Sequence, residues 1–148
     1  PNPAVVEDGL AVLNRRVVKI NQRGRTSLFI SNRHLITFNY IPKIPLIPDY
    51  ERTFLMEMAM AGDIEYLEKF RQDLKEHRFA LIVIEPLYGQ IRGPNENVIF
   101  REENNAWVEQ VAVYIRCYYQ EDLLLKDLQI QLFVPDPIPN KAQCPTEP

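Results

Sequence analysis

Three short polar segments contain the side chains best suited to bind a ligand or to catalyse a reaction. They are Ser31-Asn32-Arg33-His34, Glu85-Pro86 and Glu102–Asn105. Arginine can hold an anion by forked hydrogen bonds, and histidine changes its charge near neutral pH. The first segment therefore suits an anionic or hydroxyl-rich ligand. Glu85 and His34 could also act together as a general acid and base.

These segments are expected to meet at one edge of a sheet, because open α/β sheets bind ligands beyond the carboxyl ends of their strands. The predicted site of ligand or partner binding consists of Asn32, Arg33, His34, Glu85, Asn104 and Asn105. A simpler interpretation is local capping. In that case the Ser31 side chain begins a helix, and the acidic residues before Asn104 complement a helix dipole.

Several kinds of enzyme are excluded by motifs that the chain lacks. Its five glycines form neither a GxGxxG pattern nor a Walker A loop, and neither of its two serines lies in a GxSxG motif. Cys117 and Cys144 have no CxxC spacing, and with only two histidines no tetrahedral zinc set is indicated. We therefore predict no metal and no cofactor, and we expect Cys117 to pack as an inert core thiol.

Composition indicates one ordinary globular domain. The chain has 148 residues, of which 46% are hydrophobic and 25% charged, and its formal charge is −3. This balance argues against nucleic acid as a partner. Residues 1–33 nevertheless carry six basic and two acidic side chains, a net charge of +4 that leaves −7 for the other 115 residues. The basic end is either a solvated helix face or a surface attracted to anionic lipid headgroups.

Hydrophobic spacing places helices and strands in alternation along the chain. Apolar residues three and four positions apart predict helices over residues 6–20, 50–61, 64–76 and 102–118, with a brief helical turn over 34–38. Apolar runs predict strands over residues 25–31, 80–85 and 128–134. The prolines of residues 41–48 allow only an edge strand near Leu46. The Tyr88–Arg101 segment is predicted to be a loop over a site or an interface.

The order of these elements predicts an α/β fold with three layers. We expect a Rossmann-like, mostly parallel sheet of about four strands with helices on both faces, in a stable monomer or weak dimer. Three regions are expected: an amphipathic N-terminal helix over residues 1–24, an α/β domain over 25–134 and a Pro-rich tail over 135–148. No apolar run approaches the ~20 residues that span a bilayer. Because the chain begins without Met, it is expected to be a processed chain or a segment of a longer protein.

Five segments, taken together, resemble a known group of proteins. They read SLFISNRHLITF, PLIPDYE, MAMAGD, RFALIV and EENNAWV and occupy residues 27–38, 45–51, 58–63, 78–83 and 102–108. In wording and order the series is similar to the C-terminal region of bacterial multi-pass membrane glycosyltransferases, in the dolichyl-phosphate-mannose protein mannosyltransferase and aminoarabinose transferase group. The resemblance spans about residues 10–135. The catalytic acid that it implies lies in membrane loops outside this chain, so no catalytic residue is assigned here.

The resemblance implies a non-catalytic accessory domain on the extracytoplasmic, periplasmic side of a membrane glycosyltransferase that uses a polyprenyl-phosphate sugar. Its implied partners are the transmembrane portion of the same polypeptide and a lipid-linked sugar or acceptor. The basic first helix would then continue a membrane span. Two alternatives stay open: a free-standing α/β ligand-binding module, and a small enzyme that uses Glu85 and His34. Hydrophobic spans encoded upstream would favour the accessory domain.

Overall fold

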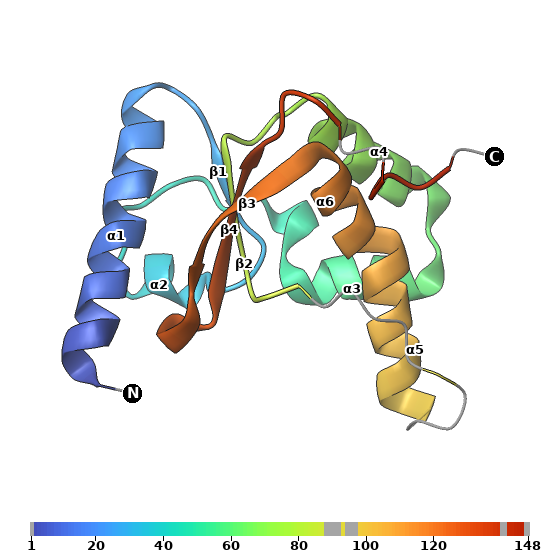
Figure 1. Ribbon diagram of the computed structural model, residues 1–148, viewed down its shortest axis with the longest axis horizontal. Helices are drawn as coiled ribbons and strands as arrows, with labels where there is room; N and C mark the ends of the chain where they lie inside the picture. Colours follow the sequence, from blue (N-terminus) through green and yellow to red (C-terminus); the bar gives the residue numbers. More distant parts are fainter. Residues whose placement is uncertain (1, 88–92, 94–97, 140–141, 147–148) are drawn as a thin grey trace.

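The structure, a computed structural model, describes residues 2–87, 93, 98–139 and 142–146. These residues form a mixed α/β fold in which one four-stranded sheet lies between two layers of helices (Figure 1). Helices α1 (Pro3–Gln22) and α2 (His34–Thr37) cover one face. The other face is covered by α3 (Arg52–Ala61), α4 (Ile64–Lys75), α5 (Val98–Trp107) and α6 (Val113–Tyr118). The predicted three layers and helices on both faces are confirmed.

The sheet is mixed, not mostly parallel as predicted. Its strands are β1 (Ser27–Phe29), β2 (Leu81–Ile84), β3 (Tyr119–Leu125) and β4 (Ile130–Pro135), in the order β1-β2-β4-β3. Only β1 and β2 pair in parallel, whereas β4 is antiparallel to both β2 and β3. The short 3₁₀ turn η3 (Lys126–Leu128) joins β3 to β4. A connection of this length permits only an antiparallel hairpin, because a parallel pair needs a long crossover.

β3 is a strand that the sequence pattern does not reveal. It directly follows α6, and a bulge between Glu121 and Leu123 breaks the alternation of buried and exposed residues. The edge strand predicted near Leu46 is wrong, because residues 42–47 form no strand. Prolines at every third position remove the N–H donors that strand pairing needs. The 3₁₀ helix η1 (Pro48–Tyr50) follows instead.

The boundaries of the two helices in the middle of the chain lie within two residues of the predicted ranges 50–61 and 64–76. Gly62 ends α3 with a φ of 63°, a left-handed conformation that glycine adopts without a steric penalty. Asp63 then caps α4, since its carboxylate accepts a hydrogen bond from the Tyr66 N–H at 3.0 Å. The last long helix begins at Val98, earlier than predicted, and the π-helical turn η2 (Val108–Ala112) joins α5 to α6. The predicted loop before it lies mostly outside the described residues.

Two hydrophobic cores, one on each face of the sheet, hold the layers together. β2 contributes Ile82 and Ile84 to the core under α3–α6, and Leu81 and Val83 to the core under α1 and α2. All four β2 side chains are fully buried. The strand predicted over residues 80–85 is therefore confirmed, and its unbroken apolar run is explained by its position inside the sheet with helices on both faces. β2 thus fixes the position of the sheet edge at which Glu85 emerges.

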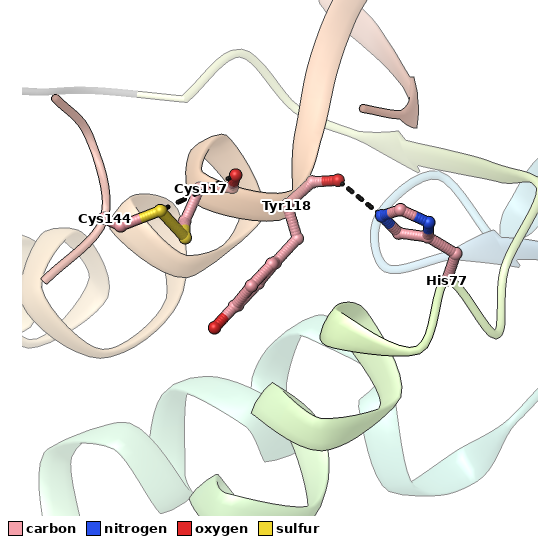
Figure 2. Close-up of a disulfide and its surroundings, with 4 residues drawn as sticks. All are labelled: His77, Cys117, Tyr118 and Cys144. Atoms are coloured by element: carbon pink, nitrogen blue, oxygen red, sulfur yellow. Dashed lines mark hydrogen bonds between the residues drawn. A yellow bond between two sulfur atoms is a disulfide. The ribbon is translucent and has the colours of Figure 1, made fainter. Parts of the chain in front are cut away.

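The Pro-rich tail is joined covalently to α6. Cys144 forms a disulfide with Cys117, with a Cα–Cα distance of 4.6 Å (Figure 2). The expectation that Cys117 is an inert core thiol is therefore wrong, although the residue is buried as predicted. Figure 2 also shows the next residue, Tyr118, whose carbonyl lies 3.0 Å from Nε2 of His77. The end of α6 is thereby tied to the tail and to the segment between α4 and β2.

Candidate functional site

A polar pocket of about 340 Å³ lies at the carboxyl ends of β1 and β2. Its lining combines the residues after β1, the start of α3, the residue after β2 and the turn before β4: Ile30, Ser31, Asn32, Arg33, Glu51, Arg52, Glu85 and Gln129. The Ile30 N–H donates to the Val83 carbonyl at 2.9 Å, which extends the parallel pairing to the strand ends. The Arg52 N–H donates to the Ile30 carbonyl at 3.0 Å and so attaches the start of α3 to the same edge.

Three of the six predicted site residues line this pocket, namely Asn32, Arg33 and Glu85. His34 begins α2 and is exposed to solvent, and it is not among the lining residues. Asn104 and Asn105 lie on α5, where the Asn104 amide donates to Oδ1 of Asn105 at 3.1 Å. The structure therefore brings together the parts of the predicted site that follow β1 and β2, and it leaves the α5 asparagines outside the pocket.

Arg33 holds the backbone of its own chain. Its Nε donates to the Phe29 carbonyl at 2.8 Å, and its Nη2 donates to the Ile47 carbonyl at 2.6 Å. Burial lowers the pKa of Arg33, and the nearby negative charge of Glu51 opposes that effect. The guanidinium expected to bind a ligand by forked hydrogen bonds instead joins the end of β1 to the segment of residues 41–48.

Glu85 is paired with Arg52 across the pocket. The Arg52 Nε donates to Oε1 of Glu85, and the guanidinium carbon lies 5.5 Å from the centroid of the Trp107 ring. Both charged side chains are partly exposed, so the pair orients them more than it stabilises the fold. No hydrogen bond joins Glu85 to His34, and His34 does not line the pocket, so the predicted acid–base pair is not formed among the described residues.

Glu51 caps α3 at the rim of the pocket. Its carboxylate accepts hydrogen bonds from the N–H groups of Thr53 at 3.0 Å and Phe54 at 3.1 Å. Burial by itself raises the pKa of Glu51, but these bonds and the charge of Arg33 lower it, and the net pKa lies below the usual value. Glu51 is therefore a carboxylate held ionised by the helix that it caps.

Two polar groups of the pocket have no hydrogen-bond partner among the described residues. They are Oγ of Ser31 and Nδ2 of Asn32, and both atoms are buried. Ser31 is only 8% exposed. The predicted capping role of Ser31 is wrong, because α2 has no side-chain cap and begins at His34 after Arg33. Asn32 adopts a φ of 63°, which turns the chain sharply at this point.

The predicted site omits five residues that line the pocket: Ile30, Ser31, Glu51, Arg52 and Gln129. The position of Ser31 at the carboxyl end of a predicted strand was a usable signal. For Arg52 no such signal exists, since it meets Glu85 from 33 residues away in the chain. Gln129 reaches the pocket because it precedes β4, whose antiparallel pairing with β2 was not predicted.

No group of three or more His, Cys, Asp or Glu side chains in the described part of the chain could hold a metal ion. Within the same residues, no helix combines the length and apolar character needed to cross a membrane. Comparison of the chain with protein-family models, with curated proteins and with solved structures found no match.

Proposed function

We propose that this chain is an extracytoplasmic accessory domain of a membrane glycosyltransferase that uses a polyprenyl-phosphate sugar, and that it binds a ligand or acceptor without catalysing the transfer. The Cys117–Cys144 disulfide is the observation that supports the extracytoplasmic location. Disulfides persist in oxidising compartments such as the bacterial periplasm and are rare in the cytosol. This feature agrees with the side of the membrane that the sequence resemblance implies.

The polar pocket supports a binding role. Arg33 is engaged by two backbone carbonyls, and Arg52 is engaged by Glu85, so the strongest charged groups already hold the pocket together. Such an arrangement gives a rigid polar surface at the strand ends, where open α/β sheets take up ligands. In the proposed assembly, the transmembrane portion of the same polypeptide performs the transfer, and this domain positions the sugar or its acceptor.

The location is tested by trapping the thiols in intact cells. Cells that express the full-length protein are quenched with acid and treated with a mass-tagged maleimide under denaturing conditions. We expect no tag on Cys117 or Cys144 unless a reductant is added first, and one tag on a Cys117→Ser variant. Two tags without reductant would place the domain in a reducing compartment and contradict the proposal.

The accessory role is tested in the full-length protein by deleting residues 27–134 and measuring transfer from a lipid-linked sugar in membranes. We expect the deletion to impair transfer while the protein still inserts into the membrane. Full transfer without the domain would contradict the role. If the reading frame encodes no hydrophobic spans upstream, the free-standing ligand-binding module is favoured instead. The pocket would serve ligand binding in that case as well.

A further inference from the structure

We infer that the pocket at the ends of β1 and β2 takes a small, neutral, hydroxyl-rich ligand, the chemistry of a single sugar ring or a similar polyol, in preference to an anion. This inference names the ligand class for the proposed binding role and rests on that role. Three features of the pocket support this ligand class: its two unpartnered groups, the charges of its lining and its size.

The unpartnered groups set the hydrogen-bonding requirement. The Ser31 hydroxyl can donate one hydrogen bond and accept others, and the Asn32 Nδ2 carries two donors. Both atoms are buried and lack a partner among the described residues, and Ser31 is only 8% exposed. A buried polar group without a partner is unfavourable, and a ligand that supplies the missing bonds removes this cost. Because both residues line the pocket, a rotation of each side chain would bring these groups to a ligand hydroxyl, which can accept from Asn32 and exchange hydrogen bonds with Ser31.

The charges of the pocket favour a neutral ligand. The lining carries two arginines, Arg33 and Arg52, and two carboxylates, Glu51 and Glu85. Arg52 is paired with Glu85, and Arg33 and Glu51 attract each other through their opposite charges. An anion would face both carboxylates and would have to break the Arg52–Glu85 pair to gain a cationic partner. A neutral polyol meets neither obstacle.

The size of the pocket agrees with this class of ligand. Its volume of about 340 Å³ lies near the lower end of the range for small-molecule pockets, about 300–1,000 Å³. Glu85 has a second carboxylate oxygen besides the one that Arg52 contacts, and carboxylates accept hydrogen bonds from hydroxyl donors. One small ring fits this volume, and Ser31, Asn32 and Glu85 all line it.

The experiment uses the ¹⁵N-labelled 148-residue chain and three probes: mannose and myo-inositol as neutral polyols, and inorganic phosphate as the anion. Each probe is added to about 50 mM, enough to saturate a site with a Kd of about 1 mM. We expect the neutral probes to shift the Asn32 side-chain amide and the backbone amides of Ser31, Asn32 and Glu85. We expect phosphate to leave these signals unchanged.

Two substitutions separate binding from folding. Ser31→Ala removes a hydroxyl that has no partner among the described residues, so the melting temperature should stay constant or rise, while the Kd for the neutral probe rises about three- to tenfold. Ser27→Ala is the matched control, because Ser27 is also buried on β1 with an unpartnered hydroxyl but does not line the pocket. It should leave the Kd unchanged. Asn32→Gly keeps the positive φ and removes the amide, and it should weaken binding in the same way.

Three results would overturn the inference: no shift with either neutral probe, stronger shifts at these residues with phosphate, or an unchanged Kd in both Ser31→Ala and Asn32→Gly. These outcomes are read from the chain alone. Failure of the accessory role is read separately, from the activity of the full-length protein without the domain and from the state of its thiols.

Discussion

The Tyr50 hydroxyl donates a 2.6 Å hydrogen bond to Oδ2 of Asp73. Tyr50 ends η1, Asp73 lies on α4, and both residues are buried. The same carboxylate oxygen accepts a 2.8 Å bond from Nη1 of Arg78, which precedes β2. This network joins the segment before α3 to the segment before β2. It therefore helps to set the relative positions of the two elements, α3 and β2, from which Arg52 and Glu85 reach the pocket.

We predict that Tyr50→Phe lowers the free energy of unfolding by about 1–3 kcal/mol, because it removes one partner of a buried carboxylate. Urea denaturation followed by circular dichroism measures the change. Tyr40→Phe is the control, since Tyr40 is 59% exposed, and its free energy of unfolding should stay close to that of the unmodified chain. Equal stability of the two variants would show that the Tyr50–Asp73 bond contributes nothing.

Stability is expected to fall in alkaline solution. Burial raises the pKa of Tyr50, Tyr66 and Tyr119, so the folded chain holds these phenolic protons more tightly than the unfolded chain does. Their contribution is fully present below the unfolded tyrosine pKa of about 10 and is lost as the pH rises above it. A pH titration should follow tyrosine ionisation by tyrosinate absorbance and unfolding by circular dichroism. Some of the tyrosines should ionise only at the pH at which the chain unfolds. Ionisation of every tyrosine before unfolding would contradict this.

We predict that Arg33→Ala lowers the free energy of unfolding by about 2 kcal/mol, because two backbone carbonyls lose a charged donor. Arg33→Lys should restore little of this loss, since a single ammonium lacks the planar fork that contacts Phe29 and Ile47 together. Thermal unfolding compares the two variants with Arg23→Ala, in which the arginine is exposed. Full rescue by lysine would show that only the charge matters.

The cap of α3 predicts a pH-dependent effect. Glu51→Ala should lower the free energy of unfolding by about 1 kcal/mol at neutral pH, because two N–H groups at the start of α3 lose their acceptor. The pKa of Glu51 is lower in the folded chain than in the unfolded chain, so its contribution is present above the unfolded value and is lost as the pH falls through the folded one. Urea titrations at several acidic pH values should show the difference shrinking. Glu57→Ala, at an exposed position on α3, is the matched control.

The disulfide predicts a redox-dependent stability. Replacing both Cys117 and Cys144 by Ala should lower the free energy of unfolding by about 2–4 kcal/mol, because the bond closes a loop between residues 27 positions apart. A reductant should bring the unmodified chain to nearly the same stability and leave the double variant unchanged. A reductant effect on the double variant would indicate a different cause.

The local elements of this fold follow from the sequence because their signals are local. The spacing of Leu13 and Val17 on α1, the left-handed stop at Gly62 and the all-apolar run of β2 each depend on residues a few positions apart. The position of Asn32, Arg33 and Glu85 at one sheet edge also follows, since parallel neighbouring strands end together.

Only the tertiary structure decided the partners of these residues and the direction of the remaining strands. Arg33 contacts Ile47, Arg52 contacts Glu85, and Cys117 bonds to Cys144. The partners are 14, 33 and 27 positions apart in the chain, and the spacing of apolar residues carries no information about such pairs. The antiparallel pairing of β4 with β2 and β3 makes the sheet mixed, because chain direction depends on the length of the connection and not on the apolar pattern of a strand. Packing of the layers likewise left the Ser31 hydroxyl buried without a partner among the described residues, a state that depends on what surrounds the side chain and not on its neighbours in sequence.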